Sequence, residues 1–318
     1  MATPRVTVGL PVFNGERYLA EAIESILGQN FADFELVIAD NGSTDGTSEI
    51  CARYASLDPR VSVHRSSVNM GAAWNYNRLV DLARGEYFKW VAHDDLLAPS
   101  MLCRCVEMLD AHDNAALAYP GVEEIDEHGS ALRVYAFPAA YADHGSALER
   151  VSAVVARHTM CYEVFGLLRT RTLRATSRIG SYWGSDRALL VELAAVGRFV
   201  RVPEILLFSR EHPERMRYST DWTAWHDTRN AGMPTLPTWR LLREFGRVAM
   251  ATPGSSLERA RTARVLARWT FRRRRFLVRQ LLLWAAYRSF VGRHLMRKRV
   301  SSSRRSRNSY APRSLTGA

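Results

Sequence analysis

The sequence predicts an α/β fold built on a doubly wound, mostly parallel sheet. Short apolar runs typical of buried strands alternate four times with helical patterns between residues 5 and 100, and the links between them are short. A polar cluster follows most of these strands, at the point where a helix is expected to begin. Because the carboxyl ends of parallel strands meet at one edge of such a sheet, these clusters are expected to share a crevice.

The predicted elements follow the chain in order. Strands are expected at 5–13, 34–39, 61–64 and between 85 and 93, with helices at 16–28, around 47–57, from 71 to 83 and from residue 100. Further along, the pattern predicts a turn at 128–129, helices at 147–158 and 188–196, and two paired strands at 199–202 and 205–208. After residue 213 it indicates a linker, then helices to about residue 296, then a Ser/Arg-rich end.

Charge is distributed unevenly along the 318 residues. Residues 259–318 hold 18 of the 44 Lys and Arg residues and no Asp or Glu, so the preceding part carries 26 basic and 32 acidic residues. The four cysteines fit no zinc-binding spacing and indicate free thiols in a reducing compartment. No apolar signal segment and no charge-free stretch long enough to span a membrane is found, which favours a cytoplasmic location.

An acidic cluster ends the fourth predicted strand, at His93-Asp94-Asp95. Adjacent carboxylates repel each other unless a cation or a donor-rich ligand compensates them, and hard divalent cations prefer carboxylate oxygens. A solvated turn with a helix-capping aspartate is the alternative. The chain has no Gly-x-Gly-x-x-Gly after the first strand and no Gly-Lys-Ser/Thr loop, which disfavours dehydrogenases and P-loop phosphotransferases.

Five clusters in order resemble the motif set of the family 2 inverting glycosyltransferases, whose nucleotide-sugar-binding fold is called GT-A. They are Pro11-Val12-Phe13-Asn14, Asp40-Asn41-Gly42-Ser43-Thr44-Asp45, Asn69-x-Gly71, His93-Asp94-Asp95 and Gly184-Ser185-Asp186. The resemblance runs from about Val6 to His212. It implies a catalytic domain at residues 1–213. The composition beyond it predicts a linker and a helical, basic extension at 214–296 and a basic disordered tail at 297–318.

The resemblance also implies a donor site. In such enzymes the turn after the first strand holds the nucleotide, and the aspartate after the second strand bonds the base, which favours a UDP or dTDP sugar because a carboxylate is an acceptor only. A turn-capping role is the alternative for Asp40 and its neighbours. The implied donor-binding residues are Pro11, Val12, Phe13, Asn14, Glu16, Asp40, Asn41, Asn69, Gly71, Asp94 and Arg210.

A metal and a general base are implied as well. The resemblance assigns Asp95, Asp94 and His212 to Mg²⁺ or Mn²⁺, with Asp95 on the metal and Asp94 on the ribose or a metal-bound water. Ala92 stands where the commonest form of the motif has its first acid. Asp186 matches the position of the base that takes the acceptor proton, and its alternative role is to cap the helix at 187–196.

The basic extension has two interpretations. Residues 276–291 are apolar but interrupted by Arg279 and Arg288, and basic clusters flank them at 272–275 and 297–299. The pattern fits a helix lying on an anionic membrane at the inner face of the cell membrane, through residues 272–299. A helix packed on the catalytic domain with a solvated basic face fits equally, and nucleic-acid binding ranks third.

The predicted function is a metal-dependent, inverting transfer of a single sugar from a nucleoside diphosphate sugar to a hydroxyl acceptor. The acceptor class is a glycan, a lipid-linked molecule or a small molecule, as in the synthesis of cell-surface polysaccharides or glycolipids. Processive relatives carry Gln-x-x-Arg-Trp and membrane spans, which this chain lacks. The alternatives are a catalytically silent scaffold of the same fold that binds nucleotide sugars or membranes, and a nucleotidyltransferase.

Overall fold

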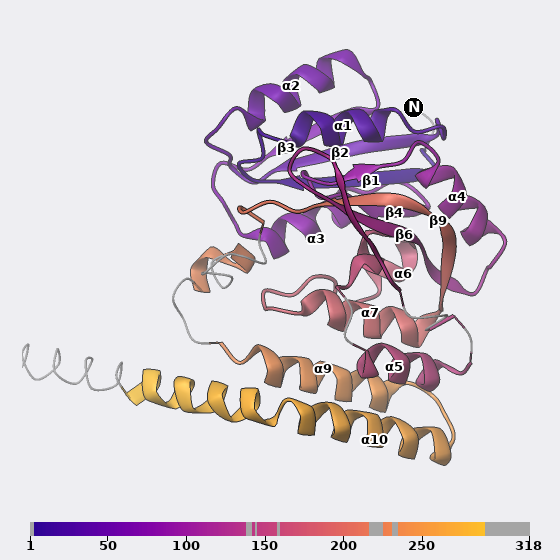
Figure 1. Cartoon of the computed structure of the whole chain (residues 1–318), viewed down its shortest axis with the longest axis vertical. Helices are drawn as coiled ribbons and strands as arrows, with labels where there is room; N and C mark the ends of the chain where they lie inside the picture. Colours follow the sequence, from indigo (N-terminus) through magenta and orange to yellow (C-terminus); the bar gives the residue numbers. More distant parts are fainter. Residues whose placement is uncertain are drawn as a thin grey trace, which may run out of the picture.

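The first half of the chain alternates strands and helices as the sequence predicts (Figure 1). The structure, a computed structural model, describes residues 3–137, 142–143, 145–157, 160–215, 225–230 and 235–289. Its first elements are β1 (Val6–Val12), α1 (Leu19–Leu27), β2 (Phe34–Asp40), α2 (Thr47–Leu57), β3 (Val61–Arg65), α3 (Ala72–Leu82), β4 (Tyr87–Trp90), β5 (Leu96–Leu97) and α4 (Met101–Asp110).

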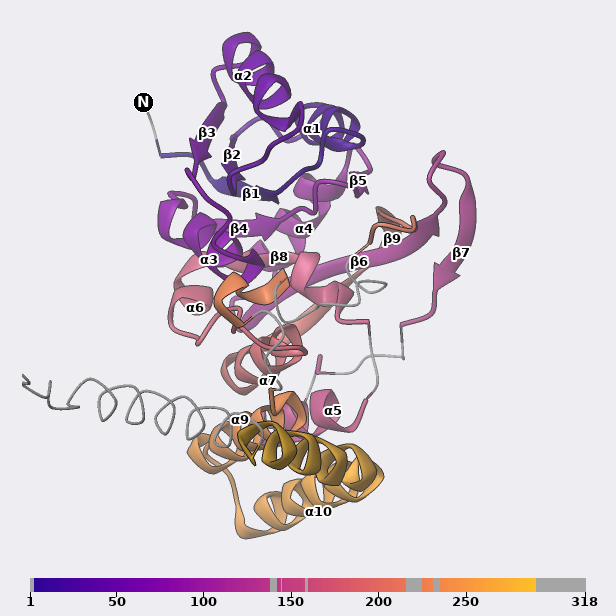
Figure 2. The same cartoon turned by 90° about the vertical axis from the view of Figure 1, so that its left-hand side faces the viewer.

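The second half completes the sheet and adds a helical layer (Figure 2). Its elements are β6 (Ala115–Ile125), β7 (Ala131–Tyr135), α5 (Ala147–Ala156), η1 (Tyr162–Phe165), β8 (Leu167–Arg169), α6 (Thr170–Arg174), α7 (Ser185–Val196), β9 (Arg198–Arg210), η3 (Thr228–Asn230), α9 (Pro237–Ala251) and α10 (Ser256–Arg272). A further helix follows at 274–289.

The sheet has the order β3-β2-β1-β4-β8-β6-β9-β5 in the part of the chain that the structure describes, with β7 paired to β6. β3, β2, β1 and β4 are mutually parallel, and β6 and β9 run in the same direction, while β8, β7 and β5 are antiparallel to their neighbours. Every residue of β1 and β2 is buried, as expected where helices cover both faces of a parallel sheet. The predicted mostly parallel α/β fold is confirmed.

One strand prediction is wrong. Residues 199–202 and 205–208 do not pair with each other but belong to the single strand β9, which pairs with β6 and, at its end, with β5. Pro203 and Glu204 separate the two apolar runs, yet the strand continues through them with shifts in the β6–β9 register, which is how a strand absorbs a bend without reversing. The predicted turn at 128–129 does reverse the chain between β6 and β7.

The helices after residue 235 pack on the helices α5 and α7. α9 contacts α7, and α10 contacts α5 and α9. Phe245 and Trp269 from these helices pack edge to face, with ring centroids 5.3 Å apart, inside the same hydrophobic core as the strands. The boundary predicted at residue 213 stays a prediction, and the predicted tail at 297–318 lies outside the described residues. No helix in the described ranges is long and apolar enough to cross a bilayer.

Candidate active site

Hydrogen bonds join the two loops at the carboxyl ends of β1 and β2. Asn14 adopts a left-handed backbone conformation, with φ at 51°, and its N–H donates to Ser43 Oγ at 2.9 Å. Its side-chain oxygen accepts from the Thr44 N–H at 2.9 Å, and Glu16 accepts from the Gly46 N–H at 2.6 Å. These bonds fix the positions of the predicted nucleotide-binding turn. Within it, Pro11 and Val12 are buried and Phe13 is exposed.

Asp40 and Asn41 are buried and fully engaged by the protein. The Asp40 carboxylate accepts from the Ser43 N–H and from Ser48 Oγ, and it pairs with Arg65 Nε at 3.3 Å. Asn41 donates to Asn69 Oδ1 at 2.9 Å and accepts from the Met70 N–H at 3.0 Å. The structure therefore gives both residues a bracing role between loops. The predicted bond from Asp40 to the base stays a prediction.

The third loop touches a segment from far along the chain. Gly71 has φ at 87°, and a Cβ built there would lie 2.6 Å from the backbone oxygen of His226. Thr228 also donates to the Asn69 carbonyl at 3.2 Å. Residues 225–230, which the sequence assigned to a linker, therefore lie against the predicted donor site.

The acidic cluster after β4 brings together Asp94 and His212. Nε2 of His212 lies 2.9 Å from Asp94 Oδ2, and both side chains are buried. Burial opposes the charge on Asp94, but the hydrogen bond with His212 and nearby positive charges hold its pKa below the usual range. Asp95 instead accepts from the Arg210 N–H at 2.9 Å, and burial together with the charge of Asp94 raises the pKa of Asp95.

Two arginines at and after the end of β9, Arg210 and Arg215, differ in their roles. Arg210 is 1% exposed, and its guanidinium donates to the Asp94 carbonyl, the Glu127 carbonyl and the Glu21 carboxylate. These partners make it a brace beneath the acidic loop, and its predicted contact with a diphosphate stays untested. Arg215, which the sequence did not single out, places a partly buried charge near Asp94 and Asp95 and bonds Ser209 Oγ at 2.7 Å.

Asp186 lies in the first turn of α7 and does not cap it. Gly184 occupies the N-cap in a left-handed conformation, and the Asp186 carboxylate accepts from the Arg187 N–H at 2.7 Å. The side chain is partly accessible, yet its burial raises the pKa of Asp186. The positive charge of His226 opposes this shift in part. Of the two neighbouring aromatic rings, Trp183 is exposed while Tyr182 is buried beneath Arg240.

Tyr76 connects the acidic loop with Asp186. Burial and the negative charges of Asp94, Asp95 and Asp186 together raise the pKa of the Tyr76 hydroxyl. Because a charge shifts a pKa only from within electrostatic range, the three carboxylates lie in the same region of the fold as this hydroxyl. The fold therefore brings residues from the loop after β4 and from the start of α7 to one site.

The residues present fit a divalent cation that needs few protein ligands. No group of three or more His, Cys, Asp or Glu side chains suited to a metal occurs in the described ranges. Mg²⁺ usually takes only one or two carboxylates, with phosphate oxygens of a substrate among its other ligands. Asp94 and His212 face each other, and Nδ1 of His212 is buried with no hydrogen-bond partner among the described residues. A cation held by Asp94 would use Nε2 of His212, the ring nitrogen that faces this carboxylate, in place of the hydrogen bond between them.

Comparisons with known proteins agree with this fold. The profile of the family described as Glycosyl transferase family 2 matches residues 7–168, just over half of the chain. Putative glycosyltransferase EpsE of Bacillus subtilis is 37% identical over 110 residues, which cover 34% of this chain and 40% of EpsE. Glycosyltransferase GlyG of Streptococcus pneumoniae is 36% identical over 97 residues, which cover 30% of this chain and 32% of GlyG. The chain therefore spans less than half the length of these relatives.

A solved structure extends the likeness of fold beyond the matched region. TarS of S. aureus in complex with UDP-GlcNAc superposes with a TM-score of 0.64 at 16% sequence identity, covering 85% of this chain and 72% of that chain. The family match, the named relatives and the fold agree on one class of protein. The chain belongs to glycosyltransferase family 2, with the GT-A fold that its motifs predicted.

Proposed function

We propose that this glycosyltransferase moves a single sugar from a nucleoside diphosphate sugar to a hydroxyl acceptor, with inversion and with a divalent metal. The observation that carries the proposal is the pairing of Asp94 with His212 at 2.9 Å, with a separate carboxylate, Asp186, on another element within electrostatic range of the same Tyr76 hydroxyl. One group of side chains suits the departing diphosphate, and the other suits the incoming hydroxyl.

Asp186 is the proposed general base. Inversion requires the acceptor oxygen to attack the sugar carbon from the face opposite the leaving group, and a carboxylate on that side takes the hydroxyl proton as the new bond forms. A raised pKa suits this role, because a more basic carboxylate accepts a proton more readily. Trp183, which is 49% exposed, offers a flat apolar surface near Asp186 for a sugar ring.

Asp94 and His212 are the proposed metal ligands. A bound Mg²⁺ or Mn²⁺ would neutralise the charge that develops on the leaving diphosphate. The geometry favours Asp94 over Asp95 for this role, because Asp94 faces His212 while Asp95 is held by the Arg210 backbone. Arg215 would add a positive charge on the same side.

The donor and the acceptor are proposed as classes. A UDP or dTDP sugar is the favoured donor, in keeping with the TarS structure solved with UDP-GlcNAc. The acceptor would be a glycan, a lipid-linked molecule or a small molecule in the synthesis of cell-surface polysaccharide or glycolipid. The enzyme would work in the cytoplasm, at the inner face of the cell membrane.

Calorimetric titration with UDP, dTDP, GDP and CMP, each with and without Mn²⁺, tests the site. Binding of UDP or dTDP is expected only with metal, and Asp94→Ala and His212→Ala should each remove that binding. Asp113→Ala and His128→Ala, which alter exposed residues of the same types, are the matched controls and should bind normally. Metal-independent binding would remove Asp94 and His212 from their roles, and a product that retains the donor's anomeric configuration by NMR would exclude inversion.

A further inference from the structure

Among the residues that the structure describes, the helix at 274–289 contacts the rest of the chain along one stripe. Leu277 is buried, and its carbonyl accepts from Trp239 Nε1 at 3.0 Å. Gln280 donates to Thr238 Oγ1 at 2.8 Å. Both partners lie on α9, so this stripe faces the body of the molecule. The other side of the helix is exposed to solvent.

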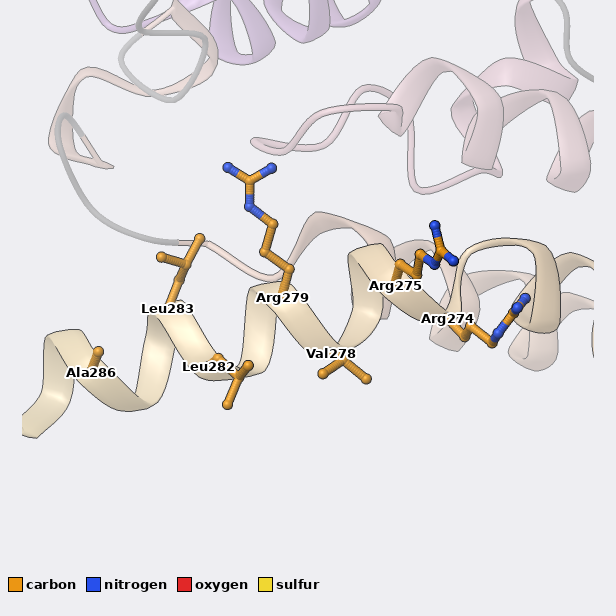
Figure 3. Close-up of a pocket in the computed structure, with 7 residues that line it drawn as sticks. All are labelled: Arg274, Arg275, Val278, Arg279, Leu282, Leu283 and Ala286. Atoms are coloured by element: carbon orange, nitrogen blue, oxygen red, sulfur yellow. The ribbon is translucent and has the colours of Figure 1, made fainter.

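The opposite side, here called the outer face, is formed by Arg275, Val278, Arg279, Leu282 and Ala286. Figure 3 shows Val278 and Leu282 pointing away from the rest of the chain. Leu282 is 66% exposed, and Phe276, Leu281 and Leu283 extend the exposed apolar surface on either side. Single exposed apolar residues are ordinary, but a contiguous group of them marks an interaction surface.

The charge of this region has one sign. Arg272, Arg274, Arg275, Arg279 and Arg288 lie on or next to this helix, and no Asp or Glu occurs from residue 259 to residue 318. An apolar surface framed by arginines complements a partner that is apolar beneath and negatively charged above. The surface of an anionic lipid bilayer has this composition.

Two other occupants fit less well. A second copy of the chain would bring arginines of one outer face against arginines of the other, with no acidic residue in 259–289 to separate them. A nucleic acid would engage the arginines but would leave Val278, Leu282 and Phe276 exposed to water.

We propose that the outer face of helix 274–289 lies in the interface of an anionic membrane, with the helix parallel to the membrane plane. The apolar side chains enter the boundary between headgroups and acyl chains, and the arginines extend to the phosphates. α9 connects this surface to the active site, because it holds Leu277 at one end and packs Leu241 against Gly184, two residues before Asp186.

This inference names the surface for the proposed location and rests on the proposed function only for its use there. Membrane binding itself requires neither donor nor catalysis. The Asp186→Asn variant should therefore bind vesicles like the wild type, so that loss of one proposal is distinguishable from loss of the other.

Co-sedimentation of the full chain with phosphatidylcholine vesicles, with and without phosphatidylglycerol, tests the proposal. Binding is expected only to vesicles that contain phosphatidylglycerol, and it should weaken as salt is added. Replacing both Arg275 and Arg279 by Gln should weaken binding about thirtyfold, and replacing Arg53 and Arg171, which are exposed elsewhere, should not.

The apolar contribution has its own variant and control. Replacing Val278 and Leu282 by Ser should reduce binding at low salt, whereas Leu57→Ser, at a residue 67% exposed on α2, should leave it unchanged. Unchanged thermal unfolding of each variant shows that the fold is intact, and the salt dependence of the wild type needs no variant. Equal binding to neutral vesicles, or a concentration-dependent dimer that the serine variants dissociate, would overturn the proposal.

Discussion

At Asp186, the proposed general base, catalysis and stability make opposite demands. Because burial raises its pKa in the folded state, the folded protein holds this proton more tightly than the unfolded chain does. Stability contributed by the protonated form is therefore lost as the pH rises through the raised pKa. At neutral pH the ionised carboxylate that a base requires costs folding free energy.

Replacing Asp186 by Asn should strongly reduce turnover while raising the melting temperature. The Asn oxygen can still accept from the Arg187 N–H, but the buried charge is gone. Loss of a general base lowers the rate by about a hundredfold to ten-thousandfold. Steady-state rates and a thermal melt at neutral pH measure the two effects. In the wild type, activity should fall as the pH is lowered through a pKa above that of an ordinary aspartate.

Asp45→Asn is the matched control with the opposite sign. The N–H groups of Thr47 and Glu16 bond to this carboxylate, and although partial burial opposes its charge, these bonds lower the pKa of Asp45. Its charge therefore stabilises the fold at neutral pH, and the variant should melt at a lower temperature. If Asp186→Asn also lowered the melting temperature, the ionised Asp186 carboxylate would not be destabilising the fold.

The sequence predicted part of the candidate site. Resemblance to a family identified Asp94, His212 and Asp186, and the structure brings the first two into contact. The sequence did not single out Arg215 or His226, because no local pattern marks them and only the tertiary fold brings their charges near the carboxylates. Arg210 is the opposite case. The resemblance assigned it to the donor, and in the structure its buried guanidinium bonds to Glu21 within the protein.

At the scale of elements, Gly71 allows the loop before α3 to meet residues 225–230. Replacing it by Ala should destabilise the protein by more than the cost of placing Ala at a positive φ, which is about 1–2 kcal/mol. The excess arises because the new methyl group would meet the His226 backbone. Chemical denaturation measures the free energy of unfolding, and calorimetry should show weaker donor binding.

Gly129→Ala isolates the conformational cost. Gly129 has the same φ of 87°, but a Cβ there would meet nothing within 4 Å. It should lose only about 1–2 kcal/mol and keep donor affinity. Equal losses of unfolding free energy in the two variants would mean that residues 225–230 do not pack against Gly71.

Element boundaries were predictable where local chemistry sets them. The turn at 128–129 followed from its glycine, and the strands β1 and β2 followed from their apolar runs. The sequence predicted two strands where β9 is one, because Pro203 and Glu204 separate its apolar runs, and its pairing with β6 shows that the chain stays extended there. The pairing with β6, a long-range contact, therefore decided the length of this strand, which the local sequence did not indicate.

At the scale of the whole molecule, the helices after residue 235 and the sheet share one hydrophobic core. Phe245 of α9 is fully buried, and it contacts Trp269 of α10 while Arg187 of α7 lies over its ring. If these helices stabilise the catalytic part, the chain should unfold in a single transition. A boundary at residue 213 would then be one of sequence and not of folding.

Replacing Phe245 by Ala tests this, because it leaves a cavity at the junction of α9, α10 and α7. The expected loss is about 3–5 kcal/mol in the free energy of unfolding, whereas Phe271→Ala, at a residue 64% exposed on α10, should lose less than about 0.5 kcal/mol. Far-ultraviolet circular dichroism and donor binding should report the same midpoint in denaturant. If donor binding persisted after the helical signal had fallen in Phe245→Ala, the extension would fold apart from the site, and a membrane-bound helix could not position Asp186 through α9.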